Sequence, residues 1–278
     1  MRIIKSEQIH DAVVDLVLKA ARYLPEDVIA ALRVARNNET SESAKEVLGQ
    51  LLENADLAKT SGLPLCQDTG LGIFYVEIGD QVHVDGNLTT IINDAMIEGY
   101  DKGLLRKSSC HPLTRQNTKD NSPAIIHIAH VDGDKLTIKH MAKGGGSENM
   151  SRCTMLTPAQ GWEGIKEFVV RRMAEAGPNP CPPTIVGVGI GGTFDQAPAL
   201  AKEALFRPLS APNPDPQLAE MEQELLDEIN QLGVGPMGLG GATTALGVKI
   251  EMRPCHIASL PLAVNVQCHS SRIKEVTL

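Results

Sequence analysis

The 278-residue sequence is poor in aromatic side chains, because Phe, Trp and Tyr together make up only 3% of it. Little of the core can consist of packed rings, so Leu, Ile, Val, Ala and nine Met residues must fill most of it. At 42% hydrophobic and 22% charged residues, the composition is that of an ordinary globular protein, which excludes wholesale disorder. A chain of this length forms one large domain or two closely packed ones.

No run of about 18 uninterrupted apolar residues occurs, so no segment is long enough to cross a bilayer as a helix. Residues Met1 to Glu7 lack the basic flank and the apolar stretch of a secretory signal. We therefore expect a cytoplasmic protein with no membrane partner. The formal charge of -8 would repel the phosphates of a polyanion, so we expect no nucleic-acid partner either.

No two of the six cysteines are separated by two residues, which excludes the local spacing of a zinc finger. They also lack the dense spacing of a small disulfide scaffold, and a reducing compartment would keep them as thiols. Ligation of a metal by cysteines from remote segments stays open, because spacing alone cannot choose among them. The candidates are Cys66, Cys110, Cys153, Cys181, Cys255 and Cys268.

Apolar positions that recur every three and four residues predict a helical segment over residues 1–62. Beyond it, helical patterns alternate with apolar runs typical of strands, which indicates layers of sheet and helix. We predict a mixed α/β (α+β) fold in which the helical N-terminal segment, 1–62, packs on a layered sheet-and-helix part, 63–278, within a single domain. The predicted helices span 6–20, 25–34, 40–59, 88–105, 158–176, 196–206 and 217–232, and the predicted strands span 72–78, 124–131, 135–141 and 184–190. Further apolar runs typical of strands span 245–250 and 260–266.

Asp132-Gly133 separates two of these strand patterns, 124–131 and 135–141. This dipeptide is favoured in the two-residue turns of β-hairpins, because both of its positions tolerate positive φ angles. The sequence therefore predicts that the two strands pair with each other as a hairpin.

Gly187, Gly189 and Gly192 follow the spacing of the dinucleotide-binding fingerprint, next to a predicted strand. Against this interpretation, Gly187 and Gly189 fall inside the strand rather than in the turn, and no second strand ends in an acidic residue about twenty positions later. Close packing of a neighbouring element against the strand explains the same glycines. A dinucleotide-binding domain stays as the alternative from a different functional class.

The sharpest local feature is the hexapeptide Leu65 to Gly70, in which a thiol, Cys66, and a carboxylate, Asp68, are two residues apart. If the glycines bend the backbone, Cys66 could bind a metal while Asp68 faces the same cavity as an acid or base. A polar turn beside a buried cysteine explains the residues equally well, since Asp and Gly are common in turns for conformational reasons.

Two other cysteines occupy positions that suit a metal ligand. Cys181 lies between prolines that stiffen the backbone, and Cys268 follows an apolar run and so is expected at the end of a strand. The remaining three are interpreted as ordinary free thiols: Cys110 in a polar loop, Cys153 at an apparent helix start and Cys255 after a proline.

The glycine run 144–146, next to Lys143, offers unhindered backbone N–H groups that can cradle an anion. Glycines that merely turn a corner explain the run as well. Arginine and histidine side chains elsewhere could contact a carboxylate, because a guanidinium matches it in bidentate geometry. These candidates are Arg106, His111, Arg115 and His256.

Taken together, these segments resemble the α subunit of the two-subunit class I (iron-sulfur) fumarate hydratases and, more broadly, the iron-sulfur hydro-lyases that include L-tartrate dehydratase. The resemblance covers nearly the whole chain. Its motifs are Leu65-Cys66-Gln67-Asp68-Thr69-Gly70, Leu105-Arg106, His111-Pro112-Leu113-Thr114-Arg115, the segment 143–149, Cys181-Pro182-Pro183 through Gly192-Thr193, and Asn265-Val266-Gln267-Cys268.

This resemblance implies that Cys66, Cys181 and Cys268 are the ligands of a 4Fe-4S cluster. Three thiolates leave one iron of such a cluster without a protein ligand. An open iron of this kind acts as a Lewis acid rather than only as an electron carrier.

The resemblance also implies roles for side chains near the cluster. Asp68, paired with His256, would handle the proton that goes to the leaving hydroxyl. Gln67, Arg106 and Gly145 would bind the substrate, a small dicarboxylate. The base that removes the carbon-bound proton is implied to lie outside this set.

In single-chain relatives, a second domain supplies that base. The resemblance therefore implies a β subunit that carries the remaining catalytic residues, an α2β2 assembly, and very low activity of this chain alone. Gly146-Ser147-Glu148-Asn149 resembles the fumarase branch, which implies reversible dehydration of malate to fumarate, a reaction of the tricarboxylic acid cycle. Dehydration of L-tartrate is the alternative within the same class.

Overall fold

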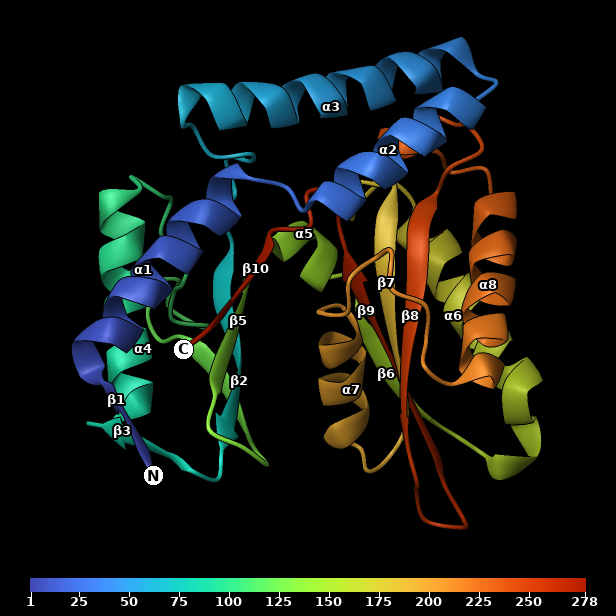
Figure 1. The fold of residues 1–278 in the computed structure, drawn as a ribbon. Helices are drawn as coiled ribbons and strands as arrows, with labels where there is room; N and C mark the ends of the chain where they lie inside the picture. Colours follow the sequence, from blue (N-terminus) through green and yellow to red (C-terminus); the bar gives the residue numbers. More distant parts are fainter. The chain divides into compact units, whose positions relative to one another are not determined.

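The computed structural model describes residues 1–278 and divides them into two compact units (Figure 1). Unit 1 consists of Met1–Pro25, Asn54–Gly145 and Arg272–Leu278, and unit 2 consists of Glu26–Glu53 and Gly146–Ser271. Each unit contains helices and a four-stranded sheet, so the predicted mixed α/β fold is confirmed. The predicted division after the helical N-terminal segment does not follow these units, because that segment contributes to both.

Each predicted helix is present, with ends that differ from the prediction by a few residues. None combines the length and the apolar character that a membrane-spanning helix needs. The helices are α1 (Ser6–Arg22), α2 (Glu26–Asn38), α3 (Glu42–Ser61), α4 (Leu88–Lys102), α5 (Gly145–Glu148), α6 (Gly161–Ala176), α7 (Gln196–Ala204) and α8 (Pro216–Gln231), with short 3-10 turns at Pro158–Gln160 and Pro236–Gly238.

The strands form one two-stranded sheet and two four-stranded sheets. They are β1 (Arg2–Lys5), β2 (Leu71–Gly79), β3 (Val82–Asp85), β4 (Ile125–Val131), β5 (Leu136–Lys143), β6 (Arg152–Leu156), β7 (Thr184–Gly191), β8 (Ala245–Arg253), β9 (Leu260–Gln267) and β10 (Ile273–Thr277). The short strands β1, β3, β6 and β10 were not predicted, and β6 contains Cys153, which therefore does not start a helix.

The predicted hairpin of β4 and β5 is wrong in its pairing. Both strands exist, but the order of the sheet in unit 1 is β10-β5-β2-β4, so β2 lies between them. The β4–β5 connection passes around the end of β2, where Gln81 N donates to the Gly133 carbonyl at 2.9 Å. As an inner strand, β2 has side chains that are buried or half-buried, whereas those of the edge strand β4 are mostly exposed.

In unit 1, α1 and α4 lie side by side against one face of the sheet (Figure 1). The apolar stripe of α1, with Ile9, Val13 and Val17, is buried there. β2 pairs antiparallel with β5, and Leu71 lies opposite Lys143. The residues that precede β2 and those that follow β5 are therefore brought to the same end of the sheet.

The core of unit 1 also contains a histidine. His140 is fully buried on β5, stacks on Phe74 with ring centroids 4.6 Å apart, and has no hydrogen-bond partner for either ring nitrogen. Burial disfavours the charged imidazolium, and the nearby Arg272 adds to this, so the pKa of His140 falls from 6.5 to about 3. The ring is therefore a neutral core side chain near pH 7.

In unit 2, the sheet has the order β6-β9-β7-β8, and helices cover both of its faces. The valines of β7 and β9 face α6 and α8, while α7 packs on the opposite face. Coverage on both sides explains why all eight residues of β7 are buried. Ile185 lies opposite Gln267, so the residues before β7 and those after β9 lie at the same end of this sheet.

The two glycines inside β7 are explained by α7. A side chain at Gly187 would overlap the Ala201 carbonyl, and one at Gly189 would overlap the Ala197 carbonyl. The backbone of α7 thus packs directly on the strand, so these two glycines serve helix–strand packing, which is the other explanation given for them. The alternative of a dinucleotide-binding domain that uses Gly187, Gly189 and Gly192 loses the support of the first two glycines.

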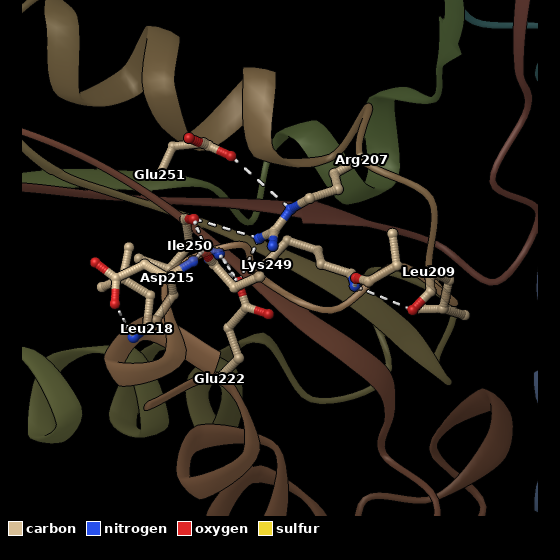
Figure 2. A network of polar contacts seen from close by, with 10 residues as sticks. Arg207, Leu209, Asp215, Leu218, Glu222, Lys249, Ile250 and Glu251 are labelled. Carbon is tan, nitrogen blue, oxygen red and sulfur yellow. Dashed lines mark hydrogen bonds and ion pairs between the residues drawn. The ribbon is translucent and has the colours of Figure 1, made fainter. Parts of the chain in front are cut away.

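A buried polar network fastens the α7–α8 connection to β8 in unit 2 (Figure 2). One oxygen of Glu222 accepts hydrogen bonds from Arg207 Nη2, from Asn213 Nδ2 at 2.8 Å and from Ile250 N at 2.7 Å. Lys249 Nζ donates to two backbone carbonyls of the connection, at 3.0 and 2.6 Å. Burial lowers the pKa of Lys249. The network is structural, because its charged groups form hydrogen bonds and ion pairs with other residues of the chain.

Replacing Glu222 tests this interpretation. Glu222→Ala leaves Arg207 half-buried without its nearest counter-ion and should lower the free energy of unfolding by about 3 kcal/mol. Glu222→Gln keeps an acceptor and should lose less. Glu220→Ala, at an exposed position of the same helix, is the matched control and should change little. Urea unfolding measures all three, and equal stability of Glu222→Ala and Glu220→Ala would contradict the prediction.

The buried His140 predicts a dependence of stability on pH. Below pH 6.5 the unfolded chain takes up a proton that the folded protein excludes down to about pH 3. Stability should therefore fall as pH decreases across this window, by at most about 1.4 kcal/mol per pH unit from this group. His140→Leu should remove that part of the slope in urea unfolding between pH 6.5 and 4, whereas His83→Gln, at an exposed position, should not. An unchanged slope in His140→Leu would refute a neutral buried imidazole.

Candidate active site

The turn Cys66–Gly70 in unit 1 is held by buried side chains that bind three consecutive backbone carbonyls. Arg272 Nη1 donates to the Asp68 carbonyl at 2.6 Å. Tyr100 Oη donates to the next two carbonyls at 3.0 and 2.8 Å, and Asn121 Nδ2 donates to the Gly70 carbonyl at 3.1 Å. Because these carbonyls lie in the protein interior, each needs such a donor, and together the donors fix the path of the turn.

Glycine is required at the end of this turn. Gly70 has a φ angle of +78°, and a side chain there would come within 2.7 Å of the Lys143 carbonyl oxygen. The close approach follows from the pairing of β2 with β5, which places the turn against the chain that leaves β5. Gly70 therefore bends the backbone here, which is compatible with both earlier interpretations of the hexapeptide.

Three donors surround the carboxylate of Asp68. Gly145 N donates to Oδ2 at 2.9 Å, while Gly70 N and Ser108 Oγ donate to Oδ1 at 3.1 and 3.3 Å. The glycine run thus donates one backbone N–H, that of Gly145, to this carboxylate. Asp68 is half-buried, so its orientation is fixed while part of it stays accessible.

The predicted substrate-binding residues lie beside this carboxylate. Arg106 Nη1 donates to Gln67 Oε1 at 2.7 Å, and Thr69 Oγ1 donates to the Arg106 carbonyl at 2.7 Å. Gln67, Arg106 and Gly145 are all exposed on unit 1. The structure thus brings together a guanidinium, an amide and a backbone N–H on an accessible surface around Asp68.

The other two candidate carboxylate partners in unit 1, His111 and Arg115, form hydrogen bonds within their own loop. The ring of His111 accepts hydrogen bonds at Nδ1 from Leu113 N and Thr114 N, at 3.2 and 3.1 Å. Arg115 has a φ angle of +61° and reaches only the Pro112 carbonyl, at 3.4 Å. Neither is joined to the Asp68 cluster by a hydrogen bond.

Two of the three predicted metal ligands lie at one end of the sheet in unit 2. Cys181 precedes β7 and Cys268 follows β9, and the Cys181 carbonyl accepts from His269 N at 3.4 Å and from His269 Nδ1 at 2.9 Å. Cys268 Sγ lies 3.1 Å from Ser270 Oγ. Cys181 has a φ angle of +55°, a strained value for a residue with a side chain.

The predicted ligands are distributed over both units, with Cys66 in unit 1 and the other two in unit 2. None of the six cysteines forms a disulfide, and these three are partly exposed. No group of three or more His, Cys, Asp or Glu side chains is gathered as a ready-made site for a metal ion. Of the other thiols, Cys153 has its pKa raised by burial, which disfavours the thiolate that a metal needs.

The position of His256 differs from that of the two thiols in unit 2. It lies in the β8–β9 connection, at the opposite end of the sheet from Cys181 and Cys268 (Figure 1). Roughly 25 Å of strand separates the two ends, at ~3.3 Å per residue. There it borders a mainly apolar pocket of about 390 Å³, together with Trp162 and Ile257. Its predicted pairing with Asp68 concerns residues of different units and stays a prediction.

Sequence reasoning did not identify the residues that hold the turn. Tyr100, Asn121, Ser108 and Arg272 carry no motif. Their roles depend on which backbone carbonyls become buried, and a single sequence does not contain that information. The positive φ of Asn121, +68°, is a local feature that an asparagine in a polar loop could have indicated.

These groups define a class of site. A carboxylate fixed by three donors, next to an arginine and an amide, is suited to acid–base chemistry on a small polar substrate. Partly exposed thiols in both units are available as ligands for a metal.

Comparison with known proteins identifies the family. The family model described as fumarate hydratase (fumerase) matches residues 10–277. The chain therefore belongs to the fumarate hydratase family, and it is a hydro-lyase.

Similar proteins include a subunit from Methanocaldococcus jannaschii that is provisionally named L(+)-tartrate dehydratase subunit alpha. It is 44% identical over 280 residues, which cover 98% of each chain. The L(+)-tartrate dehydratase subunit alpha of Escherichia coli strain UTI89 is 33% identical, and that of strain K12 is 32% identical. Both matches cover 90% of this chain and 84% of the relative.

Proposed function

We propose that this chain is the α subunit of a 4Fe-4S hydro-lyase that removes water from a four-carbon 2-hydroxydicarboxylate. The observation that carries this proposal is the fixed Asp68 carboxylate with Gln67, Arg106 and Gly145 around it, in a chain of the fumarate hydratase family. Malate, which loses water to give fumarate, is the first candidate substrate. L-tartrate is the second, and the names of the relatives favour it.

Asp68 in its protonated carboxyl form is proposed to give its proton to the leaving hydroxyl, which departs as water and leaves the Asp68 carboxylate. Its carboxylate is held by N–H and O–H donors on both oxygens, so a substrate hydroxyl would meet it in one orientation. Arg106 supplies a positive charge for a substrate carboxylate, and the Gln67 amide and the Gly145 N–H can orient the same molecule. His256 is proposed as the partner of Asp68 in this proton transfer.

Cys66, Cys181 and Cys268 are proposed to hold the cluster. The donor set fits, because none of the three cysteines forms a disulfide, all three are partly exposed, and thiolates are the ligands that iron-sulfur clusters use. When bound through three cysteines, such a cluster supplies a Lewis-acidic iron for the hydroxyl that leaves.

A β subunit is proposed to complete the enzyme. Dehydration also needs a base for the carbon-bound proton, and the residues around Asp68 supply none besides that carboxylate. The relatives are named as subunits alpha, which supports a second kind of chain. An α2β2 assembly is the simplest closed arrangement of two such chains with two-fold symmetry.

The ligand assignment predicts the iron content of cysteine variants. After anaerobic co-expression with a candidate β chain, the purified protein should contain about four irons per α chain. Cys181→Ser should lose most of this iron, because only two thiolates remain. Cys153→Ser is the matched control and should keep it. Equal iron in both variants would overturn the assignment of Cys181.

The role of Asp68 predicts a loss of turnover. Asp68→Asn keeps the shape of the side chain but cannot transfer the proton, so kcat should fall by about 10²- to 10⁴-fold on whichever of malate and L-tartrate is turned over faster. Arg171→Gln, on the exposed surface of α6, should keep the activity of the wild type. The α chain assayed without the β chain should be nearly inactive. Full activity of Asp68→Asn, or of the isolated α chain, would refute the corresponding part of the proposal.

A further inference from the structure

Arg272 is among the largest fully buried side chains of the protein, with 1% of it exposed. A buried positive charge is costly unless it is paired and hydrogen-bonded. The Nε of this guanidinium has no hydrogen-bond partner. A core residue chosen only to fill space would not carry this charge, so the guanidinium needs another explanation.

The contacts of Arg272 point to the Asp68 turn. Its carbonyl accepts from Ala142 N at 3.0 Å, which fixes its backbone at the start of β10 beside β5. From there Nη1 reaches the Asp68 carbonyl at 2.6 Å. Nη2 lies beside Gly144, where an added side chain would be 3.4 Å from Nη2 and 3.5 Å from Asp68 Oδ2. Gly144 thus leaves the space between guanidinium and carboxylate free of a side chain.

The three carbonyl-binding side chains of the turn have different targets. Tyr100 and Asn121 bind the carbonyls of Thr69 and Gly70, which lie after the reacting residue. Arg272 alone binds the carbonyl of Asp68 itself. It holds the main chain of that residue, while Gly145 N holds the side chain. The two contacts therefore fix both the main chain and the side chain of Asp68.

We propose that Arg272 is a positioning residue of the hydro-lyase reaction, which holds the backbone of Asp68 so that its carboxylate keeps one orientation toward the substrate. This inference rests on the proposed role of Asp68. Arg272 acts through Asp68 rather than on the substrate, because its side chain is closed to solvent. Its charge strengthens the hydrogen bond to the carbonyl.

Two variants of Arg272 separate positioning from simple core packing. Arg272→Met keeps much of the volume and removes both the charge and the donors. Arg272→Lys keeps the positive charge and an N–H donor but loses the planar guanidinium with its paired donors. In the complex with the β chain, Arg272→Met should lower kcat by about 10²-fold with KM changed less than about threefold, because the substrate contacts remain. Arg272→Lys should recover part of the loss.

Amide hydrogen exchange gives a readout that does not require turnover. Arg272→Met should speed exchange in the peptide that contains residues 66–70 by about tenfold, while the rest of unit 1 exchanges as in the wild type. Arg171→Met, at an exposed position in unit 2, is the matched control for both measurements. The iron content of Arg272→Met should equal that of the wild type.

Each alternative outcome overturns the inference. An increase of KM at constant kcat would make Arg272 a substrate-binding residue, and an equal loss with Met and Lys or a loss of iron would make its role one of packing or cluster retention. Unchanged exchange at 66–70 would show that it does not hold the turn. If the wild-type complex dehydrates neither malate nor L-tartrate, the proposed function fails, and the exchange measurement still decides whether Arg272 holds the turn.

Discussion

The candidate active site depends on one constraint, the need to satisfy the backbone carbonyls of a turn that passes through the protein interior. Three consecutive carbonyls, from Asp68 to Gly70, accept hydrogen bonds from buried side chains. Buried polar groups without partners are costly, so these donors leave the turn few alternative paths. The positions of the exposed side chains of the site, Gln67 and Arg106, depend on this fixed backbone.

In unit 2, close packing rather than hydrogen bonding fixes the positions of the candidate site residues. Glycines inside β7 let α7 approach the strand closely, and larger side chains on the other face pack against α6 and α8. The sheet is therefore held from both sides, and its register places Cys181 and Cys268 at the same end. In unit 1 hydrogen bonds fix a loop, whereas in unit 2 close packing fixes the strands that carry the thiols.

The sequence predicted the long elements well because amphipathic periodicity is a local signal. Helices such as α1 and α8 appear within a few residues of their predicted ends. Strand pairing was harder, since Asp132-Gly133 correctly marked a turn but could not reveal that β2 lies between β4 and β5. The cluster around Asp68 was predicted from a family resemblance, whereas Arg272 and Tyr100 escaped because burial of a carbonyl depends on tertiary structure.

The route of the chain has a consequence for synthesis. Unit 1 is built from three separate stretches, and its strand β10 (Ile273–Thr277) pairs with β5. Because Arg272 immediately precedes that strand, the Asp68 turn lacks one of its anchors until β10 has been synthesised and has paired with β5. Unit 1 therefore cannot mature before residues 146–271 of unit 2 have been synthesised, and strand pairs so distant in sequence form slowly.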